Sequence, residues 1–164
     1  MQTENTVEMA GDLDHIVALA ADVERWPEIL PHYRWVTLLD GGGDHKTVEM
    51  AARRGPIPVK WRATQDIERD GATPVIRYHH IWGVTKGMDV AWTFEPAEGR
   101  FKVRIDHDYT PSWPVIGPIV GRPIADGIIG PQFVGAIAGK TLATIKEIVE
   151  NRSSKFSPDG SIRS

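Results

Sequence analysis

A two-residue alternation of apolar and polar side chains runs through most of residues 33–110 and limits what this chain can fold into. The clearest runs are 59–68, 88–95 and 101–110. Successive side chains of a strand point to opposite faces, so this period predicts strands with one dry and one solvated face. Turn sequences rich in Gly and Asp separate the runs, at 41–44, 70–71 and 98–99. The pattern predicts six strands joined as an antiparallel meander.

The dry face of these strands can be read from the alternation. Its expected members are Val59, Trp61, Ala63, Gln65, Ile67, Ile76, Tyr78, His80, Trp82, Met88, Val90, Trp92, Phe94, Phe101, Val103, Ile105, His107 and Tyr109. Several of these side chains are polar, and a buried polar group without a partner costs a few kcal/mol. They therefore need hydrogen bonds to one another, to water or to a ligand, and an internally satisfied core network is the simplest alternative.

Helices are expected before and after the meander in the sequence. A short strand at 6–9 precedes a helix that begins after Asp12, and a second short helix covers 22–30. Pro131 opens a long helix to about Asn151, with apolar residues three and four positions apart. Only this helix can cover the dry face. The prediction is an α+β helix-grip fold, a curved seven-stranded antiparallel sheet around a long C-terminal helix. The domain is expected over residues 1–151, followed by a polar tail at 152–164.

The segment 111–131 is rich in Pro and Gly and yet carries many large aliphatic side chains. Long loops without regular structure are uncommon in compact domains and often cover functional sites. We therefore expect a lid over the open end of the grip, which could touch a membrane or a carrier protein transiently. A contact between copies of the chain is the alternative, so a monomer and a homodimer both remain open.

Composition narrows the class of protein. The chain has 164 residues, a net charge of −3 and no cysteine. The charge gives no reason to expect nucleic acid or an anionic membrane as a partner, and without cysteine there is no disulfide and no thiolate metal site. No signal peptide is visible at the start, and the uncharged runs are too short to span a bilayer. We expect a cytoplasmic protein without integral membrane insertion.

Three segments resemble the polyketide cyclase/dehydrase and coenzyme Q-binding family of the START-like superfamily. They are the helix-turn segment ADVERWPEILPHY at 21–33, the strand WTFEP at 92–96 and the helix TLATIKEI at 141–148. The resemblance covers about 150 residues in the same order of elements. It implies an internal cavity between sheet and helix that holds a small apolar ligand such as a polyketide, a quinone or a lipid.

The resemblance also implies site residues. Trp26 and Tyr33 match the family's first Trp and Tyr, and Trp61 matches its strand Trp. In this chain Gln65 stands where the family's aromatase/cyclases place an Arg, which removes the cation that would orient an enolate. The residues expected to contact the ligand are Trp26, Tyr33, Trp61, Tyr78, Trp92, Phe94, Ile137 and Thr141. No cofactor and no metal is expected.

Three functions are open: a binding or carrier protein, a cyclase or dehydratase, and a protein whose cavity is filled and which only mediates assembly. His80 and His107 lie on the fifth and seventh runs, with one strand between them. Two strand spacings are about 9–10 Å, too wide for a direct hydrogen bond but suited to bracketing a substrate as general acid and base. The expected catalytic set is His80, His107, Tyr109 and Gln65. The missing Arg favours a binding function, and the two histidines on the dry face leave an enzymatic function as the alternative.

Overall fold

The computed structural model describes residues 1–54, 56–110 and 131–155. Seven strands form one antiparallel sheet in the order β1-β7-β6-β5-β4-β3-β2. The strands are β1 Gln2–Met9, β2 Tyr33–Gly42, β3 His45–Arg54, β4 Ile57–Glu68, β5 Val75–Gly83, β6 Met88–Ala97 and β7 Arg100–Tyr109. Strands β2 to β7 follow each other as a meander, and β1 pairs with β7. This confirms the predicted sheet.

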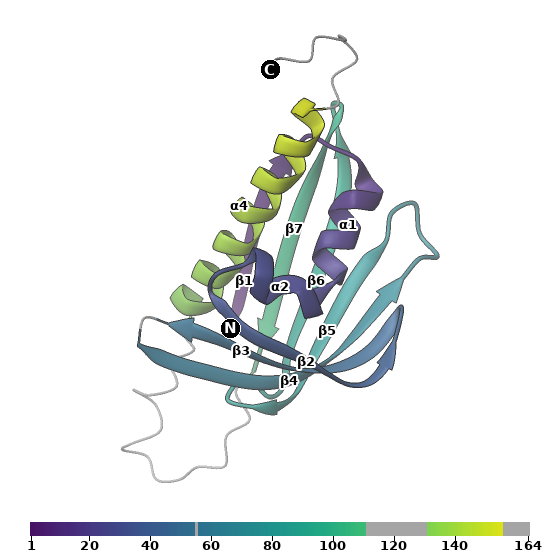
Figure 1. The fold of residues 1–164 in the computed structure, drawn as a ribbon. Coiled ribbons are helices and arrows are strands. Elements are labelled where there is room, and N and C mark those ends of the chain that lie inside the picture. Colours follow the sequence, from purple (N-terminus) through teal and green to yellow (C-terminus); the bar gives the residue numbers. More distant parts are fainter. Residues whose placement is uncertain (55, 111–130, 156–164) are drawn as a thin grey trace, which may run out of the picture.

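Among the described residues, four helical elements cover one side of the sheet, which bends around them (Figure 1). They are α1 Leu13–Ala21, the 3-10 turn η1 Val23–Arg25, α2 Trp26–Ile29 and α4 Pro131–Lys155. Asp12 stands at the N-cap of α1, although its side chain makes no capping hydrogen bond. The α+β helix-grip fold is therefore as predicted.

Helix α4 is longer than its apolar stripe suggested. It ends at Lys155, so residues 152–155 belong to the helix and not to a tail. These residues carry no Pro or Gly that would stop the helix, and Arg152 and Lys155 place positive charge beside the negative end of its dipole. Strand β1 likewise begins at Gln2, four residues before the predicted start, because its polar side chains hid the alternation.

The core lies between the sheet and the helices. Phe94, Ile105 and Val103 from the sheet and Ile16, Ile145 and Val149 from the helices are all 2 % exposed or less. This burial follows from the alternation in the sheet and from the three-and-four spacing in α4. In the part of the chain described by the structure, no helix is both long and apolar enough to cross a membrane.

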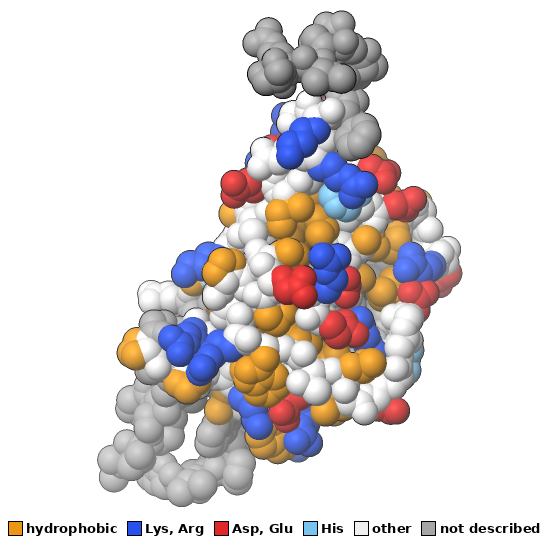
Figure 2. All heavy atoms as spheres, in the orientation of Figure 1, with side chains coloured by type: hydrophobic (Ala, Val, Ile, Leu, Met, Phe, Trp, Pro, Cys, Tyr) orange, Lys and Arg blue, Asp and Glu red, His pale blue; other side chains and the backbone are white. Residues whose placement is uncertain are grey.

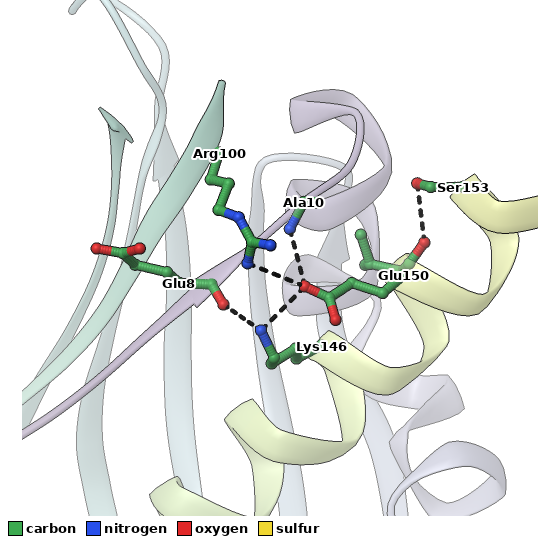
Figure 3. A network of polar contacts seen from close by, with 7 residues as sticks. Glu8, Ala10, Arg100, Lys146, Glu150 and Ser153 are labelled. Atoms are coloured by element: carbon green, nitrogen blue, oxygen red, sulfur yellow. Dashed lines mark hydrogen bonds and ion pairs between the residues drawn. The ribbon is translucent and has the colours of Figure 1, made fainter. Parts of the chain in front are cut away.

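A polar network fixes the second half of α4 against β1 and β7 (Figure 3). The Glu150 carboxylate accepts hydrogen bonds from the Ala10 backbone N–H at 3.1 Å and from the Lys146 ammonium at 2.9 Å. Lys146 also donates to the Glu8 carbonyl oxygen at 2.6 Å, and Arg100 lies 3.7 Å from Glu150. The contacts hold the helix in one position along the sheet.

On the face shown in Figure 2, charges of both signs are interspersed with hydrophobic side chains.

The prediction for Trp82 is wrong, because this side chain is 46 % exposed and lies on the outer face. The register of β4 and β5 shifts between Arg62 and Ala63, so that Ile81 is an extra residue in β5. Such a bulge reverses the faces of the residues that follow it. Gly83, at φ 95°, completes the bend, and a Cβ there would lie 2.5 Å from the Lys60 carbonyl oxygen. Trp82 packs outside against the Arg62 guanidinium at 5.0 Å.

Candidate functional site

A cavity lies between the concave face of the sheet and the first half of α4. The space between its walls and across its open mouth is about 620 Å³, part of which is open solvent. Water-sized spheres can be centred in only about 80 Å³ of it, so the enclosed part is narrow. Its lining comprises Trp26, Tyr33, Met50, Trp61, Tyr78, His80, Thr85, Met88, Val90, Trp92, Ile105, His107, Phe133, Val134, Ile137, Ala138 and Thr141.

Most of the expected site residues come together in this lining. From the expected ligand-contact set they are Trp26, Tyr33, Trp61, Tyr78, Trp92, Ile137 and Thr141, together with the two expected catalytic histidines His80 and His107. Gln65, Tyr109 and Phe94 are buried outside it. The lining residues that sequence reasoning did not select are Met50, Thr85, Met88, Val90, Ile105, Phe133, Val134 and Ala138. The lining residues from β6, β7 and α4 follow the strand period of two and the helix spacing of three and four. Extending these patterns to the site would have selected them.

Three of the expected site residues use their polar atoms to cap the C-terminal end of α1. The last carbonyls of a helix lack partners within the helix. Here Leu19 O accepts from Trp26 Nε1 at 3.0 Å, Ala20 O from the Tyr78 hydroxyl at 3.2 Å and Ala21 O from Gln65 Nε2 at 2.9 Å. The Gln65 amide therefore positions α1 on the sheet, and its side chain does not line the cavity.

Tyr109 and Phe94 also have identifiable surroundings. The Tyr109 hydroxyl donates to the Val84 carbonyl oxygen at 3.0 Å, which ties the end of β7 to the turn between β5 and β6. Phe94 is fully buried in the core. The catalytic role of Tyr109 and the ligand contact of Phe94 stay predictions. The lid expected at 111–131 lies outside the described residues except for Pro131.

His80 lies in the cavity wall, where a hydrogen bond and a stacked ring contact it. Its Nδ1 lies 2.6 Å from the Thr85 hydroxyl, and its ring stacks on Trp61 with centroids 5.7 Å apart and planes 9° from parallel. Burial lowers the pKa of His80 to about 3, with further contributions from His107 and His79. At neutral pH this imidazole is uncharged.

His107 occupies the same wall two strands away, as the strand order predicted. His107 pairs with Val90 of β6, and Val90 pairs with Tyr78 of β5. His80 follows Tyr78 by two residues on the same face of β5, so it is a diagonal neighbour of His107 across the sheet. Burial lowers the pKa of His107 to about 4. Among the described residues, His107 Nδ1 and Trp61 Nε1 are buried in the cavity lining without a hydrogen-bond partner.

The lining is neutral. None of the described residues that form it is Lys, Arg, Asp or Glu. A buried cation does exist nearby: Lys46 of β3 lies opposite Gln65 but is paired with Glu24 at 2.5 Å and does not line the cavity. The described residues also include no group of three His, Asp or Glu side chains that could hold a metal ion.

A hydrogen-bond cluster that the sequence did not reveal joins the cavity to the protein surface. The Thr141 hydroxyl donates to the Ile137 carbonyl oxygen at 2.9 Å and lies 2.9 Å from His32 Nε2. It also forms a hydrogen bond with the Tyr33 hydroxyl, and burial raises the pKa of Tyr33 well above its usual value. Burial and the Lys140 charge lower the pKa of His32 to about 4. No periodicity marks His32, which lies in a turn.

We expect acid to destabilise this fold through His80 and His107. Their pKa values in the folded protein lie below the 6.5 of a free imidazole, so the unfolded chain binds more protons between pH 6.5 and pH 4. Stability should fall as the pH drops through this window, by about 2.5 kcal/mol per group at pH 4.5. Urea unfolding at pH 7 and pH 4.5 measures the difference. In His107→Phe, which lacks one of the two buried imidazoles, the loss of stability between the two pH values should be about half as large. Equal stability at both pH values would contradict the burial of neutral histidines.

Comparison with known proteins identifies similar sequences. The profile of a family described as polyketide cyclase / dehydrase and lipid transport matches residues 10–126. A Streptomyces halstedii protein provisionally named a polyketide cyclase is 27% identical over 94 residues, which cover 57% of this chain and 86% of that protein. The granaticin polyketide synthase bifunctional cyclase/dehydratase of Streptomyces violaceoruber is 27% identical over 110 residues, which cover 66% of this chain and only 34% of that protein.

Solved structures share the fold at low sequence identity. The Zhui aromatase/cyclase from Streptomyces sp. R1128 has a TM-score of 0.70 and 16% identity, with 99% of each chain covered. A protein of Thermus thermophilus has a TM-score of 0.76 and 15% identity, with 93% of this chain and 99% of that chain covered. A START superfamily protein from Mycobacterium smegmatis has a TM-score of 0.64 and 15% identity, with 92% and 98% covered. At these identities the likeness concerns the fold alone.

Proposed function

Because this chain belongs to the polyketide cyclase/dehydrase and lipid transport family, we propose that it holds a small, flat, apolar molecule in its cavity as a carrier or binding protein. The observation that carries the proposal is the narrow cavity, whose walls are aromatic and aliphatic and hold no charged residue among those described. Apolar walls with a few polar groups are typical of small-molecule sites. A polyketide, a quinone and a lipid are the candidate ligands.

The unpartnered polar atoms of the cavity indicate what the ligand carries. Trp61 Nε1 is a donor only, and a neutral His107 can donate or accept at Nδ1. A buried donor without a partner is costly, and a ligand carbonyl or hydroxyl oxygen would satisfy it. The parallel pair of Trp61 and His80 also presents flat surfaces for stacking on a ring. We therefore favour an oxygen-bearing aromatic compound, such as a quinone or a phenol, over a fatty acid.

Titration of the purified protein with menadione, 2-naphthol and dodecanoic acid tests the proposal. We expect menadione and 2-naphthol to quench the tryptophan fluorescence saturably and to raise Tm, because a ligand that binds only the folded state stabilises it. Dodecanoic acid should act more weakly. If none of the three compounds quenches saturably or shifts Tm, the proposal is wrong.

The second candidate is a cyclase or dehydratase, and the observation that favours it is the pair of uncharged imidazoles on one cavity wall. Against it, a base with a pKa of about 3 or 4 abstracts protons poorly at neutral pH, and no cation lies in the described lining to stabilise an enolate. We therefore place binding first. The assignment to the cytoplasm and the choice between monomer and homodimer remain proposals from the sequence.

A variant separates the two functions. If the protein is an enzyme, His80→Phe/His107→Phe should abolish conversion of a poly-β-ketone thioester, while 2-naphthol still binds with an affinity lowered by no more than about tenfold through the loss of the His107 hydrogen bond. The physical reason is that Phe keeps the ring surface and removes the nitrogen atoms. A carrier should show no conversion above the buffer rate in either form. Conversion at the wild-type rate by the double variant would exclude acid–base chemistry by these histidines.

A further inference from the structure

A second hollow lies on the outer side of the cavity wall and is open to solvent. It is lined by Pro31 and His32 before β2, by Arg53 near the end of β3, and by three residues of α4: Lys140, Ala143 and Thr144. Water can occupy a volume of about 490 Å³ there. We name it the Arg53–Lys140 cleft.

The charged residues that line this cleft are all positive. Arg53 and Lys140 come from different elements and face the same space. Within the described part of the chain, neither forms an ion pair with a carboxylate, whereas Arg62 of β4, Arg69 just after β4 and Arg77 of β5 each do. The Lys140 charge is near enough to His32 to lower the pKa of that imidazole. The cleft thus concentrates positive charge that the described residues do not neutralise.

His32 adds a titratable group to the same cleft. Since the Thr141 hydroxyl gives its proton to the Ile137 carbonyl oxygen, it accepts from His32, and His32 Nε2 must carry a proton. The neutral imidazole therefore keeps its lone pair on Nδ1. An anion beside it would favour protonation of Nδ1, which would supply another donor and another positive charge. Burial and Lys140 oppose that protonation while the cleft holds no anion.

We propose that the Arg53–Lys140 cleft binds a phosphate group. A guanidinium presents a planar pair of donors that fits two phosphate oxygens, and an ammonium supplies a point charge. A dianionic phosphate would balance the charges of Arg53 and Lys140, which a single carboxylate would not. A small phosphate ester and a lipid headgroup present the same oxygens, so either source fits the cleft. This site goes beyond the proposed function, which concerns the cavity alone.

The cleft and the cavity share one wall. Lys140 faces the cleft, and the next residue, Thr141, lines the cavity. The Thr141 hydroxyl forms hydrogen bonds with both His32 and Tyr33. A phosphate bound outside would thus lie one side chain away from a molecule bound inside. The geometry suits a ligand or a carrier with an apolar part and a phosphate.

Titration with inorganic phosphate, followed by NMR of the histidine side chains at constant ionic strength, tests the small-molecule source. We expect saturable shifts of the His32 signals with a Kd of a few mM, and a rise of about one unit in the pKa of His32. The variant Arg53→Gln/Lys140→Gln should lose at least tenfold in affinity. Its His32 pKa should already be raised without phosphate, because the Lys140 charge is gone. The control Arg34→Gln/Lys86→Gln removes two cations outside the cleft and should bind as the wild type does.

Sedimentation with phosphatidylcholine vesicles that contain phosphatidic acid tests the headgroup source. Binding that the double variant Arg53→Gln/Lys140→Gln loses and the control keeps would assign the phosphate to a lipid. If neither inorganic phosphate nor vesicles bind, or if the control variant loses as much as the cleft variant, the site does not exist. The cavity proposal fails separately, because the cleft variant should still bind 2-naphthol with wild-type affinity.

Discussion

Replacement of Ile145 by Asp is expected to unfold the domain or to abolish its soluble expression. Ile145 is fully buried in the middle of α4, where the helix packs on the sheet. A carboxylate there would lose its hydration without gaining a partner, and the methyl groups that fill the core would be removed. We expect a loss of at least 4–5 kcal/mol, roughly the lower end of the total stability of a domain.

The measurement is urea unfolding followed by tryptophan fluorescence and far-UV circular dichroism. Ala136→Asp, at an exposed position of the same helix, is the matched control and should unfold close to the wild-type midpoint. A soluble Ile145→Asp protein with a cooperative transition near the wild-type midpoint would contradict the packing of α4 on the sheet.

Filling the cavity should abolish ligand binding without harming the fold. Ala138 lines the cavity from α4 and is 4% exposed, and Leu in its place would add an isopropyl group to the narrow enclosed space. Because that space admits the centres of water-sized spheres over only about 80 Å³, little room for a ring would remain. We expect Ala138→Leu to weaken the binding of 2-naphthol at least tenfold. Tm should stay within a few degrees of the wild-type value or rise, since filling a cavity often stabilises a core.

Fluorescence titration and thermal unfolding, with and without 2-naphthol, measure both effects. Ala136→Leu makes the same change on the exposed side of the helix and should bind as the wild type does. Retained affinity in Ala138→Leu would place the ligand elsewhere. A large drop in Tm for this variant alone would show that the cavity wall cannot accommodate the larger side chain.

The fold was largely predictable because its signals are local. A strand period of two and a helix spacing of three and four reveal which side each residue faces, and they correctly placed Trp61, Tyr78, His80 and His107 on the concave face. The alternation predicted the wrong face for Trp82, because one bulge residue in β5 reverses the faces of the residues that follow it. A bulge is set by pairing with the neighbouring strand, so the sequence of β5 alone does not reveal it.

The candidate site was only partly predictable, because a polar side chain on the concave face can point to several places. Gln65 and Tyr78 occupy neighbouring strands of the same face, and both reach the last carbonyls of α1. Tyr78 still lines the cavity, and Gln65 does not. The difference depends on where α1 lies over the sheet, which is a matter of tertiary packing.

The sequence by itself determined the sheet, the covering helix and the apolar character of what lies between them, because periodicity dictates the face of each side chain. Only the tertiary structure decided which of these side chains surround empty space and which bond to a helix end. It alone brought His32, Thr141 and Tyr33 into contact across more than a hundred residues, and it alone placed Arg53 and Lys140 around one cleft. Such contacts depend on how separate elements pack, and no local pattern encodes the distance between two elements.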